Sequence, residues 1–445
     1  MENDKQSGPN VRVWHLAGPL IISNVSVALL GVVDTAVVGH LEHAYYLGAV
    51  AIGSVIFDFL YWSMGFLRMG TTGVVAQRQG GQDSNGTRVA LLHAGFIALF
   101  IALIIILFQG PIIRAGLYMA GGSQNVSVYA REYLRWGIWG APAVLTSMAL
   151  LGWLLGMQNA RAALVIAVTV NLVNIILDLV FVFGLHLDVR GVALASVLSQ
   201  YIGLAVAILF VHLELNKHPG NWPTAEVLNK NGLLEFLQLN LDIFIRTICL
   251  IFAFAFFTRQ GARQGDQVLA ANAVLLNFQA VLALALDGFA NAAEVLVGKA
   301  VGSRDKNLLY VSIKTCVKLS VIAALTFTVV FAIAGELMIR FMTGLPQVRS
   351  LCYTYLPWLI ASPLISVWCF LLDGVFIGAT RTREMRDMML VSTFLVFIPA
   401  WFIFQFLGNH GLWLAFMMFF AARGGTLLVT AVRINRGTGF IKAGI

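Results

Sequence analysis

The chain has 445 residues, a formal net charge of +8 and 11% charged residues, whereas about a quarter of the residues in soluble domains are charged. Apolar runs of about twenty residues recur along its whole length with short connections, which excludes a soluble catalytic domain of ordinary size. The basic residues are scattered among the connections, which argues against a nucleic-acid partner. The composition predicts an all-α integral membrane protein embedded in a lipid bilayer.

Twelve apolar segments predict twelve transmembrane helices. In chain order, they are expected at residues 16–38, 46–69, 89–108, 133–156, 162–184, 191–213, 233–257, 268–297, 308–335, 352–378, 389–407 and 412–432. Most Lys and Arg residues fall in the connections on one side if both termini are cytoplasmic, so the positive-inside rule predicts cytoplasmic N- and C-termini.

The longest polar connection, "ELNKHPGNWPTAEVLNKNG", divides the chain nearly in half. It predicts an N-lobe at 1–213, an inter-lobe cytoplasmic linker at 214–232 and a C-lobe at 233–445. A duplication supports this division, because "YLRW" at 133–136 recurs as "YLPW" at 355–358. The offset between these two stretches, called the repeat offset below, pairs further residues: Gly80 and Asp83 with Gly302 and Asp305, Gly152 and Gly156 with Gly374 and Gly378, and Arg161 with Arg383.

Each half contains an even number of predicted helices, so both halves enter and leave the membrane on the same side. Two six-helix lobes are therefore expected to be related by a pseudo-two-fold axis along the membrane normal. This arrangement is typical of transporters that work by alternating access. A static scaffold is the alternative interpretation of such a tandem duplication.

Two amides and one acid interrupt the apolar segment at 162–184. Asn171, Asn174 and Asp178 fall on one helical face, and an intramembrane carboxylate costs about 2.5–3.5 kcal/mol on insertion scales. The first helix carries a second acid, Asp34, and Pro19, which removes one backbone hydrogen bond and allows a bend. The two acids predict a proton-binding site, with hydrogen-bonded structural carboxylates and a static kink as the alternatives.

The second half has its own polar row. Asp287, Asn291 and Glu294 share one face of the eighth predicted helix, and Asp373 lies near the middle of the tenth. Arg246, or alternatively Lys314 or Lys318, could neutralise an acid of this row. A structural ion-pair network and a substrate or ion site both remain open for these acids.

Neither HExxH nor GxSxG occurs, no His and Cys residues show the spacing of a metal site, and Cys249, Cys316, Cys352 and Cys369 lie in apolar segments as expected free thiols. We therefore expect no metal, no cofactor and no enzymatic activity.

The stretches "RAALVIAVTVNLVNIILDLVF", "GVALASVLSQ", "ALDGFANAAE" and "LLDGVFIGATR", together with Pro19 and Asp34, resemble the multidrug and toxic compound extrusion (MATE) transporters, specifically the DinF branch. The resemblance covers nearly the whole chain. It implies two six-helix lobes and drug efflux driven by a cation gradient, usually of protons in this branch, although sodium has been argued for some members.

The resemblance also implies roles for single residues. Asp34 matches the first-helix aspartate that is thought to be protonated as that helix bends at its proline, and Asp178 and Asn174 match the fifth-helix acid and amide. Tyr133 and Ser196 match the residues that complete the polar network of the N-lobe, with Ser196 at the position of a familiar threonine. The chain departs from the sodium-coupled NorM-like branch at Phe370, which occupies the place of an expected tenth-helix acid.

These observations predict a monomeric, proton-coupled antiporter of the bacterial inner membrane that exports uncharged or cationic amphipathic, drug-like compounds. Sodium-coupled efflux and a lipid-linked oligosaccharide flippase are the alternative transport functions. A flippase would require a strongly cationic cavity for a pyrophosphate group, whereas the first half offers acids and amides. An intramembrane enzyme is the alternative from another class.

Overall fold

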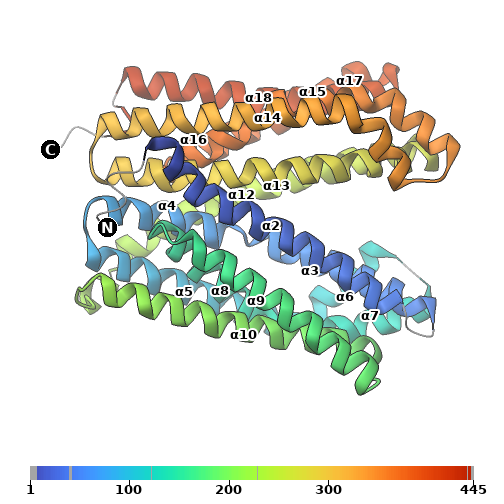
Figure 1. The fold of residues 1–445 in the computed structure, drawn as a ribbon, viewed down its shortest axis with the longest axis horizontal. Coiled ribbons are helices and arrows are strands. Elements are labelled where there is room, and N and C mark those ends of the chain that lie inside the picture. The colour runs from blue at the N-terminus through green and yellow to red at the C-terminus, as the bar shows by residue number, and fades with distance from the viewer. Residues whose placement is uncertain (1–7, 40–42, 122, 228, 438, 442–445) are drawn as a thin grey trace. The chain divides into compact units, whose positions relative to one another are not determined.

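The structure is a computed structural model that describes residues 8–39, 43–121, 123–227, 229–437 and 439–441, and every regular element within these ranges is a helix (Figure 1). Eleven of the described segments are helical, long and apolar enough to cross a bilayer. Helix α2 (Pro9–Gly39), with 31 residues, adds a twelfth long helix. The prediction of an all-α membrane protein is confirmed.

The elements that follow α2 in the first half are α3 (Ala44–Ser63), α4 (Phe66–Gly80), α5 (Ser84–Leu107), α6 (Gln109–Ala120), α7 (Gln124–Gly137), η1 (Ile138–Gly140), α8 (Ala141–Gly156), α9 (Ala160–Asp178), η2 (Leu179–Gly184), α10 (Asp188–Lys217) and α11 (Thr224–Val227). Those of the second half are α12 (Lys230–Arg263), α13 (Asp266–Gly302), α14 (Lys306–Met342), α15 (Pro346–Gly378), α16 (Thr382–Leu390), η3 (Val391–Phe397), α17 (Ile398–Phe404), η4 (Gln405–Leu407) and α18 (Asn409–Arg436).

The helices extend beyond the apolar segments that predicted them. Helix α14, for example, is expected at 308–335 and observed at Lys306–Met342. Apolar runs mark only the part of a helix that suits hydrocarbon, while the helix continues with polar residues toward water. The short helices α6 and α11 were not predicted, because neither contains an apolar run long enough to cross a bilayer.

The chain divides into two compact units. Unit 1 comprises Met1–Ile21 and Gln238–Ile445, and unit 2 comprises Ile22–Leu237. The chain passes from one unit to the other inside two continuous helices, α2 and α12. The division into lobes at the linker stays a prediction. The first turns of α2 belong to unit 1, and the linker belongs to unit 2.

The duplication is visible in the backbone as well as in the sequence. Asp83 accepts a hydrogen bond from Gly86 N at the start of α5, and Asp305 accepts one from Leu308 N at the start of α14. Residues with positive φ also recur at the repeat offset: Gln82 (57°) with Arg304 (54°), Gln158 (67°) with Thr380 (52°), and His186 (52°) with Gly408 (58°). Equivalent turns therefore connect equivalent helices in the two halves.

The repeated glycine pairs mark close helix contacts. On α15, a Cβ added to Gly374 would lie 2.2 Å from the carbonyl oxygen of Ala290 on α13, and one on Gly378 would lie 2.3 Å from that of Glu294. On α8, a Cβ at Gly152 would lie 2.4 Å from the carbonyl oxygen of Arg68 on α4. Both repeats thus use a Gly-x-x-x-Gly spacing to bring two backbones together, as membrane helices commonly do.

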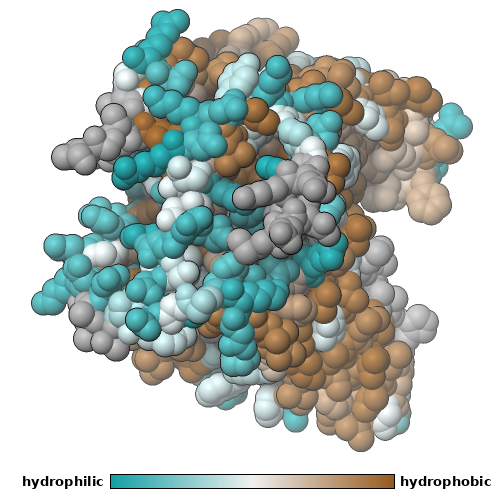
Figure 2. All heavy atoms as spheres, turned by 60° about the vertical axis from the view of Figure 1, so that its left-hand side comes forward, coloured by the Kyte–Doolittle hydropathy of each residue, from teal (hydrophilic) through white to brown (hydrophobic). Residues whose placement is uncertain are grey.

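Apolar side chains cover the flanks of the helices. Ile333, Leu395 and Phe406 are among the exposed large hydrophobic residues, at 81%, 70% and 76% exposure. In Figure 2, hydrophilic residues gather toward the viewer, at the left-hand helix ends of Figure 1, while hydrophobic residues cover the receding sides. This distribution suits helices whose flanks face lipid and whose ends face water.

Candidate functional site

The predicted polar face of α9 exists. Asn171, Asn174 and Asp178 are 7%, 1% and 0% exposed, whereas Leu172 and Ile176 on the other side of the same helix are 56% and 57% exposed. The helix therefore buries its polar face inside unit 2 and turns its apolar face outward. Burial of a carboxylate in a membrane helix is expensive and marks Asp178 as a candidate functional residue.

A π-helical segment, η2 (Leu179–Gly184), begins directly after Asp178. In a π-helix the backbone hydrogen bonds skip one more residue than in an α-helix, and such segments are frequent at functional sites. This segment was not predicted, because no residue pattern in "LVFVFG" distinguishes a π-turn from an α-turn.

Asn171 links α9 to the first helix. Its Nδ2 donates a hydrogen bond to Oγ of Ser26 on α2, at 2.7 Å, and both residues belong to unit 2. The second part of α2 and the polar face of α9 are therefore in direct contact. Only the backbone of Asp34 is described, within α2, so the position of its side chain relative to Asp178 lies outside the described part of the chain.

The two residues expected to complete the network lie on neighbouring helices of unit 2. Tyr133 on α7 is buried, and its hydroxyl lies 3.5 Å from Oγ of Ser54 on α3. Its ring occupies the space beside Gly53, where an added Cβ would lie 2.2 Å from Cδ1 of Tyr133. Ser196 is half-buried on α10. That these two residues share one pocket with Asn174 and Asp178 stays a prediction.

The predicted polar residues of the second half lie on two adjoining helices of unit 1, α13 and α15. Asn291 and Glu294 on α13 are buried and Asp287 is half-buried, while Asp373 on α15 is 5% exposed. The shared face that the spacing predicted on α13 therefore carries one partly accessible acid and two buried polar groups.

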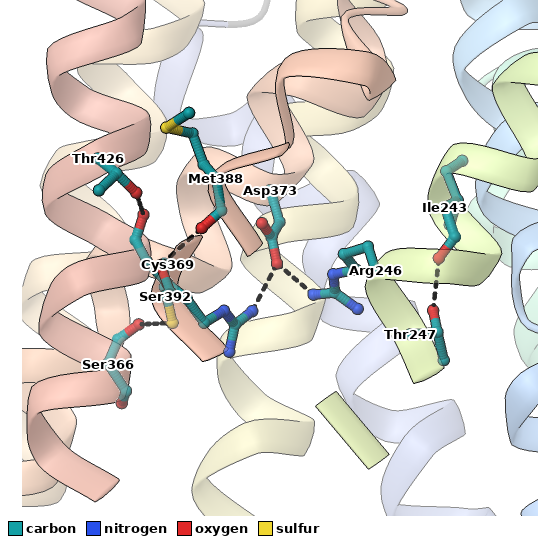
Figure 3. Close-up of polar contacts among 10 residues, drawn as sticks. Ile243, Arg246, Thr247, Ser366, Cys369, Asp373, Met388, Ser392 and Thr426 are labelled. Carbon is teal, nitrogen blue, oxygen red and sulfur yellow. Dashed lines mark hydrogen bonds and ion pairs between the residues drawn. The ribbon is translucent and has the colours of Figure 1, made fainter. Parts of the chain in front are cut away.

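Asp373 is the centre of a buried ion-pair cluster (Figure 3). Its Oδ2 accepts hydrogen bonds from Nη2 of Arg246 on α12 and, at 2.7 Å, from Nη2 of Arg423 on α18. All three side chains are buried, with exposed fractions of 8% for Arg246, 7% for Asp373 and 2% for Arg423. The guanidinium of Arg423 also lies over the rings of Phe419 and Phe420, at 5.4 and 5.8 Å.

This cluster answers part of the question that the sequence left open. Arg246 does neutralise an intramembrane acid, and the ion pair that it forms is with Asp373 on α15. The participation of Arg423 was not predicted. A signal was available, because "FFAARGGTLLV" places one arginine in the middle of an apolar segment, where an unpaired charge is costly.

The two repeats do not carry the same polar groups. At the repeat offset, Asn174 and Asp178 correspond to Val396 and Ala400 of the second half, and Asp373 and Arg423 correspond to Leu151 and Tyr201 of the first. The buried acid of α9 therefore has no acidic counterpart in the second repeat, and the ion-pair cluster has none in the first. The duplicated scaffold holds two chemically different sites.

No group of three or more His, Cys, Asp or Glu side chains that could hold a metal ion occurs among the described residues. The four cysteines are buried and free.

Helices that cross a bilayer, a duplicated unit and buried polar residues in both halves define a multi-pass membrane protein with the architecture of a transporter. The MatE family model matches residues 19–180 and 243–403, and the chain belongs to this family. Members of the family are transporters, which confirms the predicted family and the prediction that the protein is not an enzyme.

Two relatives and one solved structure illustrate the similarity. DNA damage-inducible protein F of Escherichia coli (strain K12) is 42% identical over 415 residues, which cover 93% of this chain and 90% of that protein. Multidrug and toxin extrusion protein 1 of Homo sapiens is 24% identical over 408 residues, covering 89% and 70%. The fold resembles the crystal structure of MATE in the straight conformation, with a TM-score of 0.87, 19% identity and 97% of each chain covered.

Proposed function

We propose that this transporter is a proton-coupled multidrug efflux antiporter that exports uncharged or cationic amphipathic compounds by alternating access. Asp34 and Asp178 bind the proton, Tyr133, Asn171, Asn174 and Ser196 form the polar network around them, and α2 bends at Pro19 when the acids are protonated. Asp287, Asn291, Glu294 and Asp373 form a second polar site, which is not the coupling site.

The observation that supports this assignment best is the complete burial of Asp178 on a helix whose opposite face is exposed. An acid that binds and releases protons at low energetic cost needs a polar network that tolerates both of its charge states. Asn171, Asn174 and the contact of α9 with Ser26 supply hydrogen-bonding groups beside it. Asp373 forms ion pairs with two guanidinium groups.

The energy available from one proton is sufficient for the proposed cycle. A proton that enters across 100 mV releases about 2.3 kcal/mol. A hundredfold gradient of a neutral substrate requires about 2.7 kcal/mol, and a difference of about one third of a pH unit supplies the remainder. One proton for each molecule of a neutral substrate is therefore enough.

Efflux from proteoliposomes distinguishes the coupling ions. We expect a fluorescent amphipathic cation trapped inside the vesicles to leave faster when the external solution is made acidic, and to show no acceleration when sodium is added outside at equal pH. Protein-free vesicles under the same gradients correct for leakage. Acceleration by sodium alone would replace the proton by sodium as the coupling ion, and transfer of lipid-linked oligosaccharides without drug efflux would favour the flippase.

We further propose that the protein lies in the inner membrane with both termini in the cytoplasm, because basic residues concentrate in the connections that this orientation places inside. A cysteine at position 217, at the end of α10 where Lys217 is now, is expected to react with a membrane-impermeant maleimide only after the cells are opened. Equal labelling in intact cells would reverse the orientation. The matched position is Arg190, at the opposite end of α10. A cysteine placed there should react with the maleimide in intact cells.

A further inference from the structure

One face of the first turns of α2 is buried in unit 1. Val13, Leu16, Ala17 and Leu20 are 0%, 5%, 0% and 6% exposed. Their spacing of three, one and three residues places them on one face of the helix. This apolar stripe extends past Pro19, whose ring removes the hydrogen bond to the carbonyl of residue 15 and leaves α2 easier to bend there.

The end of this segment lies against a glycine of α13. A Cβ added to Gly288 would lie 2.4 Å from Cγ1 of Ile21 and 3.3 Å from the carbonyl oxygen of Ala17. Nearer the start of α2, the ring of Trp14 meets the ring of Phe289 edge to face, with centroids 5.5 Å apart. All of these residues belong to unit 1, so the contact is internal to one compact unit.

The contact at Gly288 includes residues on both sides of Pro19. Ala17 precedes the proline and Ile21 follows it, and both approach the same glycine. When a helix bends at a proline, the segments before and after it change direction relative to each other. A bend at Pro19 therefore changes the positions of Ala17 and Ile21 relative to each other at Gly288.

We propose that Gly288 is a positioning residue that holds α2 straight across Pro19, and that Ile21 must leave Gly288 before α2 can bend. This inference rests on the proposed function for the assumption that α2 bends during transport. Any side chain larger than hydrogen at position 288 displaces Ile21 and favours the bent form. Gly288 thereby sets the balance between the straight and bent forms from a helix that contains neither Pro19 nor the coupling acids.

The test is a set of variants that alter the size of the two contacting residues. Gly288→Ala is expected to lower the maximal rate of efflux about fivefold or more, because the added methyl group overpacks the contact. Gly288→Ala combined with Ile21→Ala is expected to restore most of that rate, because the shortened side chain makes room for the methyl group. Gly425→Ala, which adds a methyl group to α18 of the same unit at a position where no atom lies within 4 Å, is the matched control and should transport normally.

A second measurement separates positioning of α2 from general packing. A nitroxide spin label on a cysteine at position 22, where Ile22 is 57% exposed, reports the local mobility of α2. Gly288→Ala should change its spectrum while Pro19 is present and should have little effect in Pro19→Ala, whose uninterrupted helix resists bending.

The proposal is wrong if Gly288→Ala transports like the control, if Ile21→Ala fails to restore efflux, or if the spectral change persists without Pro19. The spin-label comparison does not depend on the coupling ion. A sodium requirement would therefore overturn the proposed function and leave this inference intact.

Discussion

Replacement of Asp34 by asparagine is expected to reduce proton-driven efflux to the level of protein-free vesicles, while the variant inserts into the membrane and purifies normally. Asparagine is close to aspartate in size and retains its hydrogen-bonding capacity, but it has no proton to exchange. If Asp34 couples proton binding to the bend of α2, a neutral side chain at this position mimics the protonated acid permanently. The transporter should then stop in one state of its cycle.

The structural basis of this expectation is the position of Asp34 on α2. Pro19 precedes it on the same continuous helix, and Ser26, between the two, accepts a hydrogen bond from Asn171 of the buried polar face of α9. If the carboxylate of Asp34 belongs to this network, as proposed, a change in its charge alters the hydrogen-bonding requirements of the network. A change in the direction of α2 is one way to satisfy them.

The measurement is the initial rate of efflux under an inward proton gradient at equal amounts of reconstituted protein. Asp266→Asn, which makes the same chemical change at an exposed helix start in unit 1, controls for the substitution itself and should retain the normal rate. Asp178→Asn should show a loss similar to that of Asp34→Asn. Full proton-driven efflux by Asp34→Asn would exclude it as the coupling residue and turn attention to Asp287 and Glu294.

Sequence patterns predicted the parts of the structure that depend on periodicity. The buried face of α9 follows from the spacing of Asn171, Asn174 and Asp178, because residues three, four and seven positions apart must share a helical face. The duplicated turns follow from residues such as Asp83 and Asp305, which cap helices at equivalent points. Local rules of this kind do not require knowledge of which helices are neighbours.

The contacts between helices could not be predicted in the same way. Arg246, Asp373 and Arg423 lie on three different helices, and their separations in the chain say nothing about which charges meet. Lys314 and Lys318 were equally good candidates on sequence grounds. The points at which the chain passes between the compact units also lack a local signal, because both lie inside continuous helices, α2 and α12.

Replacement of Asp373 by asparagine is expected to destabilise the folded protein strongly and to lower its unfolding temperature. Asp373 supplies the negative charge that pairs with both Arg246 and Arg423, and both guanidinium groups are almost fully buried. Removal of one partner from a buried ion pair costs about 3–5 kcal/mol, because it leaves a buried charge uncompensated. The free energy of unfolding of a typical protein is only about 5–15 kcal/mol.

The ion pairs of the cluster predict that its three residues contribute differently to the stability of the folded protein. Arg246→Gln or Arg423→Gln leaves one arginine paired with Asp373, so each should cost less than Asp373→Asn. The triple variant Arg246→Gln/Asp373→Asn/Arg423→Gln contains no charge in the cluster and should recover much of the lost stability, because uncharged groups of similar size can replace a buried ion pair at little cost.

The unfolding temperature of each variant in detergent measures these differences in stability. Size-exclusion chromatography shows whether each variant is monodisperse. Asp242→Asn is the matched control: Asp242 also pairs with an arginine, Arg386, but that arginine keeps a second partner in Asp387 and is 26% exposed. It should therefore lower the unfolding temperature much less than Asp373→Asn does. If Asp373→Asn unfolds at the temperature of the unaltered protein, or if the triple variant is no more stable than the single one, charge compensation is not what Asp373 contributes. A stable Asp373→Asn variant that has lost only proton-driven efflux would instead place Asp373 in the coupling machinery.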